Sequence, residues 1–300
     1  DGTAGSQCGV APDARIMSLK VLSSAGGGNE SDVWESMQYS IDNGAQVISM
    51  SLGWQHAWGP NRQQWRNMCN AVLAGGIIMS VAAGNEGDEQ GTYPIPDNVR
   101  TPGDVPPPWL HPDQALIGGL SAVVTVGATN SSDVIANFSS RGPVTWESIN
   151  PWFDYPYNPE MGLIDPDVCA PGVNIKSLSY SGDNLYASGW NGTSMATPHV
   201  AGAIALMLEK NPNITQAFID SVLEVTAVEL GNPGKDNTYG SGRIDCYEAV
   251  DKTPTLGSPD APTLISPFDF ARLPDTQPLL QFFSNDPQNE NIEYRVFWDT

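Results

Sequence analysis

The sequence predicts a three-layer α/β/α fold around a mainly parallel β-sheet. Short apolar runs alternate with stretches whose apolar residues recur at helical spacing, and most connections between them are short. This order needs right-handed crossovers, which produce parallel strands. The chain has 300 residues and is 40% hydrophobic, enough to bury a large core. No apolar run reaches the roughly 20 residues of a membrane span, so we expect no membrane insertion.

The first half of the chain supplies most of the predicted sheet. We expect strands at four apolar runs, namely residues 14–22, 46–52, 77–82 and 122–128. Helices are predicted at residues 31–42 and 62–73, and glycines follow both. Residues 88–114 are polar and rich in proline, which indicates a long surface loop.

The composition changes after Lys252. We interpret residues 1–252 as the α/β domain and residues 253–262 as a linker rich in proline. Residues 263–300 resemble the start of a small β-sandwich of the fibronectin type III kind, with strands expected at 263–267, 278–282 and 292–298. Because the last strand is cut short and residues 1–5 lie in mid-motif, we expect the chain to be a piece of a longer protein.

The chain is strongly acidic. Lys and Arg number 13 against 34 Asp and Glu, a net charge of -21, which argues against nucleic acid and anionic membranes as partners. We expect a secreted, monomeric protein. The four cysteines are widely spaced without a C-x-x-C pair, which argues against zinc. Disulfides stay open, and we favour buried free thiols for some or all of the cysteines, because Cys69 lies in a helix pattern and Cys169 in an apolar strand pattern. The four cysteines are Cys8, Cys69, Cys169 and Cys246.

One serine precedes the most apolar helix of the chain. Residues 191–202 read Asn-Gly-Thr-Ser-Met-Ala-Thr-Pro-His-Val-Ala-Gly and lead into an apolar run that ends at Leu208. Ser194 therefore lies at a predicted helix start, where free N–H groups and the helix dipole favour negative charge on a nearby oxygen. This makes Ser194 a candidate nucleophile. The alternative is that it only caps the helix.

Two further segments follow predicted strands directly. They are Ser51-Leu52-Gly53 and Ala82-Ala83-Gly84-Asn85. The carboxyl ends of parallel strands share one edge of a sheet, so both segments are expected near Ser194. The amide of Asn85 could donate to a developing oxyanion without carrying a charge. The alternative is that Asn85 only makes a turn beside glycine.

These segments together resemble the subtilisin-like serine peptidases, or subtilases. Residues 192–202 are similar to their nucleophile segment, residues 82–87 to their oxyanion loop, and residues 138–142 and 170–172 to further motifs, so the likeness covers about residues 9–250. The resemblance implies a serine endopeptidase that hydrolyses proteins or peptides, with Ser194 as nucleophile and Asn85 as oxyanion donor.

The resemblance also implies where the substrate binds. Ser51, Leu52 and Gly53 would pair with the substrate backbone as an added strand. The pocket for the residue before the scissile bond would have small residues in its walls, leaving room for a large apolar side chain. These residues are Ala82, Ala83, Gly84 and Gly127.

The base and its orienting carboxylate are missing from this pattern. The histidines are His56, His111 and His199, and none lies in the His-Gly-Thr-His context of the family. Residues 9–14 and 20–22 resemble the segments that come directly after that context in subtilases. We therefore expect the triad Asp and His upstream of Asp1, and the 300-residue chain alone to be nearly inactive.

Two other functions compete with this interpretation. An α/β-hydrolase needs its histidine after the serine, and none follows His199. A catalytically dead subtilase domain acting as a binding or adhesion scaffold is the alternative. We expect no cofactor for the chemistry. Structural calcium would take oxygens from aspartates, although without an ordered ligand loop we interpret these as surface carboxylates. The candidates are Asp165, Asp167, Asp183 and Asp236.

Overall fold

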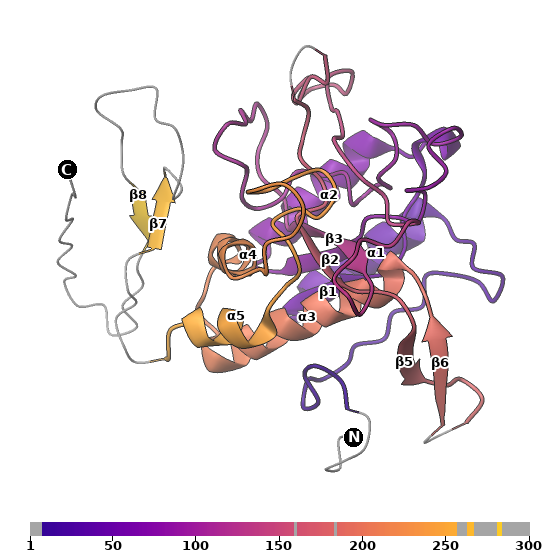
Figure 1. Cartoon of the computed structure of the whole chain (residues 1–300), viewed down its shortest axis with the longest axis vertical. Helices are drawn as coiled ribbons and strands as arrows, with labels where there is room; N and C mark the ends of the chain where they lie inside the picture. The colour runs from indigo at the N-terminus through magenta and orange to yellow at the C-terminus, as the bar shows by residue number, and fades with distance from the viewer. Residues whose placement is uncertain (1–7, 159–160, 183–184, 257–262, 267–280, 284–300) are drawn as a thin grey trace.

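The central sheet of the computed structural model has four parallel strands. The structure describes residues 8–158, 161–182, 185–256, 263–266 and 281–283. The strands lie in the order β1-β2-β3-β4, and Figure 1 labels β1, β2 and β3 at the centre of the domain. Their bounds are β1 Val47–Met50, β2 Ile78–Ala82, β3 Val123–Thr129 and β4 Val168–Pro171. The expected strands at residues 46–52, 77–82 and 122–128 are confirmed.

Helices cover both faces of this sheet. The helices α1 (Glu30–Asp42) and α2 (Arg62–Ala74) pack together on one face, and α3 (Thr193–Lys210) packs on the other face across all four strands (Figure 1). α4 (Gln216–Val225) and α5 (Cys246–Lys252) contribute to the core on the α3 side. The three-layer α/β/α prediction is therefore confirmed. The remaining elements of this domain are the short helix η1 (His56–Trp58) and the antiparallel pair β5 (Ile175–Leu178) and β6 (Tyr186–Trp190).

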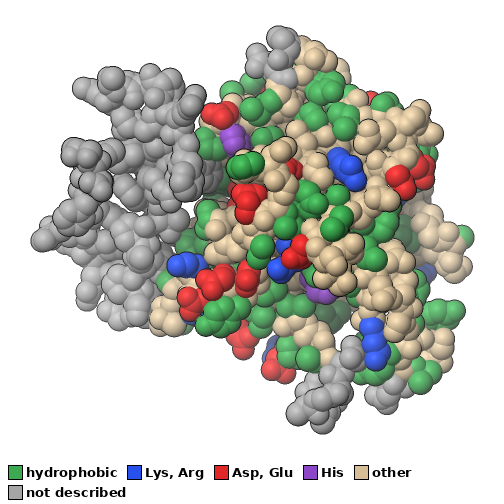
Figure 2. All heavy atoms as spheres, in the orientation of Figure 1, with side chains coloured by type: hydrophobic (Ala, Val, Ile, Leu, Met, Phe, Trp, Pro, Cys, Tyr) green, Lys and Arg blue, Asp and Glu red, His purple; other side chains and the backbone are tan. Residues whose placement is uncertain are grey.

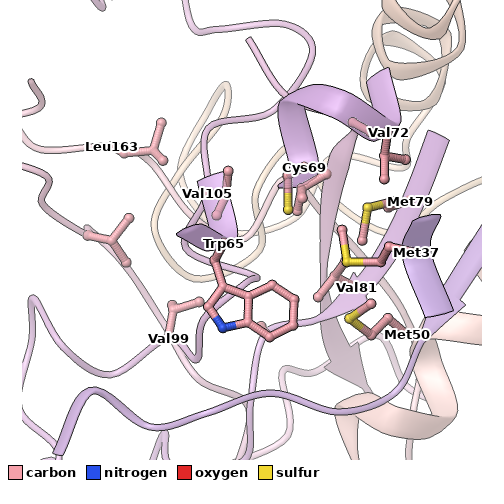
Figure 3. Close-up of a cluster of buried hydrophobic side chains, with 14 of the residues drawn as sticks. Met37, Met50, Trp65, Cys69, Val72, Met79, Val81, Val99, Val105 and Leu163 are labelled. Carbon is pink, nitrogen blue, oxygen red and sulfur yellow. The ribbon is translucent and has the colours of Figure 1, made fainter. Parts of the chain in front are cut away.

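Successive residues of β2 point to opposite faces and so join different cores. Ile78 belongs to the core under α3, whereas Met79 and Val81 belong to the core under α1 and α2. Figure 3 shows Met79 and Val81 in this second core, with Trp65 beside them. Trp65 is fully buried, and its indole N–H donates to Glu30 Oε1 at 2.5 Å, which ties the start of α1 to α2. Because successive side chains of a strand point to opposite faces, the sheet has an apolar core on each face, and helices cover both cores.

The first expected strand, at residues 14–22, is absent. The structure describes this segment without strand pairing, and Ile16 is 86% exposed. An apolar extended segment becomes a strand only when its N–H and C=O groups pair with a neighbour. Val21 still packs against the core under α1 and α2.

The loop at residues 88–114 is not confined to the surface as expected. Residues 101–108 are buried, because the loop's backbone is hydrogen-bonded inside the fold. Thr101 and Trp54 exchange two backbone hydrogen bonds of 2.9 and 2.7 Å, and the Trp146 indole donates to Asp104 O at 2.7 Å. This burial brings the loop against the ends of β1 and β2.

The prediction that some or all of the cysteines are buried free thiols is confirmed for Cys69 and Cys169. All four cysteines are free, and burial raises the pKa of the Cys69 and Cys169 thiols, but Cys8 is exposed. Acidic side chains are spread over the face of the molecule shown in Figure 2. Among the described residues, no helix is both long and apolar enough to cross a membrane.

The structure describes one strand pair in the C-terminal segment. Strands β7 (Thr263–Ser266) and β8 (Gln281–Phe283) are antiparallel. Residues 257–262 of the expected linker and the expected strand at 292–298 lie outside the described residues. The linker and the β-sandwich therefore stay predictions.

Candidate active site

Ser194 and Ser51 lie against each other across the end of the sheet. Ser194 is the second residue of α3, and its Oγ lies 3.4 Å from the carbonyl oxygen of Ser51. In return, Ser51 Oγ donates to the carbonyl oxygen of Ser194 at 2.8 Å. The Ser194 carbonyl oxygen has no partner within the helix, because Pro198, four residues later, has no N–H to donate. The proline therefore lets the helix start and the end of β1 bind each other.

Asn85 is fixed by the residue before Ser194. The backbone N–H of Thr193 donates to Asn85 Oδ1 at 2.9 Å, and Thr193 Oγ1 lies 3.1 Å from the same oxygen. Because Oδ1 accepts from Thr193, the Nδ2 group of Asn85 remains a donor. The structure thus brings Asn85 and the start of α3 together, as the position of both at one edge of the sheet predicts.

Gly192 separates two N–H donors. A β-carbon at this position would lie 3.6 Å from Asn85 Nδ2 and 3.6 Å from the backbone nitrogen of Ser194. Gly192 has φ 150° and ψ 156°, a conformation available essentially to glycine alone. Both donors therefore border a position that only a residue without a side chain leaves open. Two such donors can stabilise an oxygen that gains negative charge.

The small residues after β2 are enclosed. Ala82 ends β2 and Ala83 has no exposed surface. A β-carbon at Gly84 would come within 2.7 Å of Glu86 Oε2 and 2.9 Å of Arg100 Cγ, so Gly84 has no room for a side chain. The structure therefore closes this loop against Arg100 and Glu86.

Gly127 lies apart from these groups. It is in β3, paired with Cys169, and a β-carbon there would meet Cys169, Pro166 and Ser139, which are all buried. Its predicted place in a pocket wall stays a prediction.

Arg100 and Glu86 were missed by the sequence analysis. The guanidinium of Arg100 is bonded to the Glu86 carboxylate, with Nε 3.0 Å from Oε2. Burial alone would raise the pKa of Glu86, but Arg100 and Gln55 outweigh it and lower that pKa. Glu86 directly follows Asn85, which was a usable signal. Arg100 lies in the proline-rich loop and gave none.

The histidines lie in other surroundings. The Nδ1–H of His199 donates to the carbonyl oxygen of Met195 at 2.8 Å. The two ring nitrogens of His56 contact Asp97 and Asp104. His111 Nδ1 accepts from a backbone N–H at 3.2 Å. In the part of the chain that the structure describes, none of the three histidines is hydrogen-bonded to Ser194.

The structure describes three of the four aspartates named for calcium, namely Asp165, Asp167 and Asp236. Asp165 and Asp167 are buried, which corrects their interpretation as surface carboxylates, and Asp167 pairs with Lys235 at 2.8 Å. Asp236 accepts three backbone N–H groups, and Asp183 lies outside the described residues. Among the residues that the structure describes, no three acidic, His or Cys side chains are arranged to hold a metal ion. Structural calcium stays a prediction without a site.

Comparison with known proteins agrees with this geometry. The subtilase family matches residues 2–242 of the chain. The chain belongs to the subtilase family. Within the family, it is 36% identical over 243 residues to subtilisin E of Bacillus subtilis (strain 168), covering 81% of this chain and 50% of that protein. It is 32% identical over 242 residues to subtilisin Savinase of Lederbergia lenta, covering 81% of this chain and 70% of that protein.

A solved structure supports the subtilase fold. A lanthipeptide protease superposes with a TM-score of 0.59 at 22% identity, covering 81% of this chain and 71% of that chain. At this identity the likeness concerns the fold alone. The chain spans about half the length of subtilisin E.

Proposed function

We propose that this subtilase is a secreted serine endopeptidase that hydrolyses peptide bonds in proteins. Ser194 Oγ attacks the scissile carbonyl carbon, the C–N bond breaks and the C-terminal product leaves as an amine, which takes up a proton. Water then hydrolyses the acyl enzyme and releases the N-terminal product as a carboxylic acid, which restores Ser194. Asn85 Nδ2 and the Ser194 backbone N–H hold the oxyanion of each tetrahedral intermediate. The supporting observation is that these two donors flank Gly192 at the same 3.6 Å from its β-carbon position.

The substrate backbone would lie along the residues after β1. Ser51, Leu52 and Gly53 directly follow the edge strand of the described sheet, where a peptide could add as a further strand. Ser51 O lies 3.4 Å from Ser194 Oγ, so a peptide paired there passes the nucleophile. Membership of the subtilase family supports protein or peptide substrates.

The base that accepts the Ser194 proton is proposed to lie outside these 300 residues. His56, His111 and His199 have partners other than Ser194 in the described structure. The 300-residue chain alone is therefore expected to hydrolyse peptides negligibly, and the protein expressed from its complete gene is expected to be active. Comparing the two against one peptide substrate tests this division.

Covalent labelling tests the nucleophile itself. A fluorophosphonate probe should label Ser194 in the protein expressed from its complete gene, with peptide mapping to locate the adduct. The variant Ser194→Ala is the matched control and should neither label nor cleave. Absence of labelling in a folded protein would overturn the peptidase and favour a catalytically dead domain that acts as a scaffold.

A further inference from the structure

The side chain of Arg100 lies between the two loops expected to hold the substrate. Its backbone N–H donates to Ala83 O at 2.9 Å, which fixes it beside the end of β2. A β-carbon at Gly53 would lie 3.0 Å from Arg100 Cβ, and one at Gly84 would lie 2.9 Å from Arg100 Cγ. The stem of Arg100 thus packs against a glycine on each side, in space predicted from the sequence to be open for an apolar side chain.

Glu86 fixes one edge of the Arg100 guanidinium. Nε lies 3.1 and 3.0 Å from the two carboxylate oxygens, and Nη2 also bonds Oε1. Glu86 is itself only 4% exposed and accepts further bonds from Gln55 Nε2 at 2.8 Å and from the Asn85 N–H at 2.9 Å. The carboxylate is therefore anchored in the fold, and it holds the guanidinium in one orientation.

The other edge of the guanidinium keeps donors for a ligand. Arginine has five N–H groups, and Glu86 engages those of Nε and Nη2. Within the described part of the chain, Nη1 has only a long contact of 3.5 Å to Gly53 O, and the Arg100 side chain is 25% exposed. The Trp58 ring lies with its centroid 5.5 Å from Arg100 Cζ and covers part of the cation. A fixed, partly exposed cation with free donors suits a carboxylate or a carbonyl oxygen.

We propose that Arg100 determines specificity: it recognises an acidic side chain, Glu in particular, on the substrate residue before the scissile bond. This rests on the proposed function, which lays the substrate backbone along Gly53, and on the pocket wall that the sequence predicts at Gly84. A large apolar side chain would have to lie against the charged guanidinium, and a Lys or Arg side chain would be repelled by it. Substrates with Glu at that position should therefore be cleaved faster than those with Phe or Lys.

The net charge of the chain works against acidic substrates at long range. With a charge of -21, the protein repels acidic peptides, but this effect is screened beyond about 8 Å at about 0.15 M salt. The contact with Arg100 is short and is screened much less. Rates should therefore be compared at that salt concentration.

A peptide series with a single changed residue tests the proposal. The protein expressed from its complete gene is given peptides that differ only in the residue before the scissile bond, namely Glu, Gln, Ala, Phe or Lys. Because the Glu peptide can form a hydrogen bond between two charged groups, we expect its kcat/KM to exceed that of the Phe peptide about 10-fold or more. A protein that cleaves the Phe or Ala peptide faster than the Glu peptide overturns the proposal.

Two variants separate recognition from folding. Arg100→Met removes the cation and keeps the stem, but it leaves Glu86 buried without its partner. The double variant Arg100→Met with Glu86→Gln avoids that charge. In both variants, the ratio of kcat/KM for the Glu peptide to kcat/KM for the Phe peptide should fall about 10-fold or more. Loss of folded enzyme lowers both kcat/KM values equally and so leaves this ratio unchanged. An unchanged ratio in the double variant overturns the proposal.

Binding distinguishes this proposal from failure of the peptidase itself. If fluorophosphonate does not label the protein and the protein cleaves none of the peptides, the proposed function fails. Calorimetry with peptides that are not cleaved still tests whether Arg100 binds an acidic side chain. A peptide that ends in Glu should bind the Ser194→Ala protein about 10-fold more tightly than one that ends in Phe, and Arg100→Met with Glu86→Gln should abolish the difference. Equal binding, or no binding of either peptide, overturns the role of Arg100.

Discussion

Arg66 and Asp154 form a buried ion pair joined by two hydrogen bonds, although 88 residues separate them in the sequence. Nη1 and Nη2 of Arg66 lie 2.9 and 2.8 Å from the two carboxylate oxygens, and the side chains are 0% and 1% exposed. The rings of Trp146 and Trp152 lie 4.9 and 4.6 Å from Arg66 Cζ. The pair therefore fixes the segment after residue 145 to α2.

Asp154→Asn should lower the free energy of unfolding by about 3–5 kcal/mol, because it leaves the Arg66 charge buried without a counterion. Urea denaturation at neutral pH measures this. The control is Asp133→Asn, which breaks an ion pair with Arg243 whose side chains are 28% and 37% exposed. It should cost about 0–1 kcal/mol. Equal losses in the two variants would contradict the prediction.

Thr193→Val should lower kcat about 2-fold to 10-fold, because Thr193 Oγ1 no longer helps to orient the Asn85 amide. Asn85→Ala should cost about 10²–10³ in kcat, the range known for removing one oxyanion donor in subtilisin itself. Since Thr193 Oγ1 is expected to act through Asn85, the double variant should be no slower than Asn85→Ala. A further loss from Thr193→Val in that background would show that the two act separately.

His56 should make the protein less stable as the pH rises. Burial alone would lower its pKa, but the Asp104 and Asp97 carboxylates outweigh burial and raise it. Charged His56 therefore stabilises the fold below its ordinary pKa of about 6.5, and this contribution is lost as the pH rises through the raised pKa. Relative to His56→Gln, the wild type should lose unfolding free energy as the pH rises above about 6.5.

His111 provides a control of opposite sign. Burial lowers its pKa despite the nearby Asp113 carboxylate, so its uncharged form is favoured in the fold. Relative to His111→Gln, the wild type should gain stability as the pH rises through about 6.5. Urea denaturation of both variants over the same pH series checks the two slopes, and slopes of equal sign would contradict the assignment.

Lys235→Met should destabilise the protein by about 3–5 kcal/mol at neutral pH. Lys235 Nζ bonds Asp167 at 2.8 Å and also Glu224, and both carboxylates would remain buried. Lys210→Met is the control, because among the described residues Lys210 bonds backbone carbonyls and no carboxylate, at 2.7 and 3.0 Å. It should cost about 1 kcal/mol. Lys235, Asp167 and Glu224 form a buried charge cluster. Equal losses of unfolding free energy in the denaturation curves of the two variants would show that this cluster does not stabilise the fold.

Glu224 makes the same cluster sensitive to pH. Burial outweighs the pairing with Lys235 and raises the pKa of Glu224 to about 7. Its protonated form therefore stabilises the fold below its ordinary pKa of about 4.3, and this is lost as the pH rises to about 7. Relative to Glu224→Gln, the wild type should lose unfolding free energy over that range. A difference that does not change with pH would contradict this.

The failures of sequence analysis have a common physical origin. The apolar residues at 14–22 have the pattern of a strand, but the structure gives them no pairing neighbour, and pattern alone supplies none. The proline-rich loop is polar, as surface loops are, yet its backbone finds partners such as Trp54 that lie far away in the sequence. Both outcomes depend on what lies next to a segment in space.

The sequence by itself determined the layers of the domain and the positions of Ser194 and Asn85 at one edge of the sheet. Hydrophobic period and chain order are local properties, and parallel strands place their carboxyl ends together. The tertiary structure alone decided that Thr193 orients Asn85 and that the stem of Arg100 lies between Gly53 and Gly84. Those contacts join residues 108 positions apart or more, or arise from the path of an irregular loop, and neither is encoded in local periodicity.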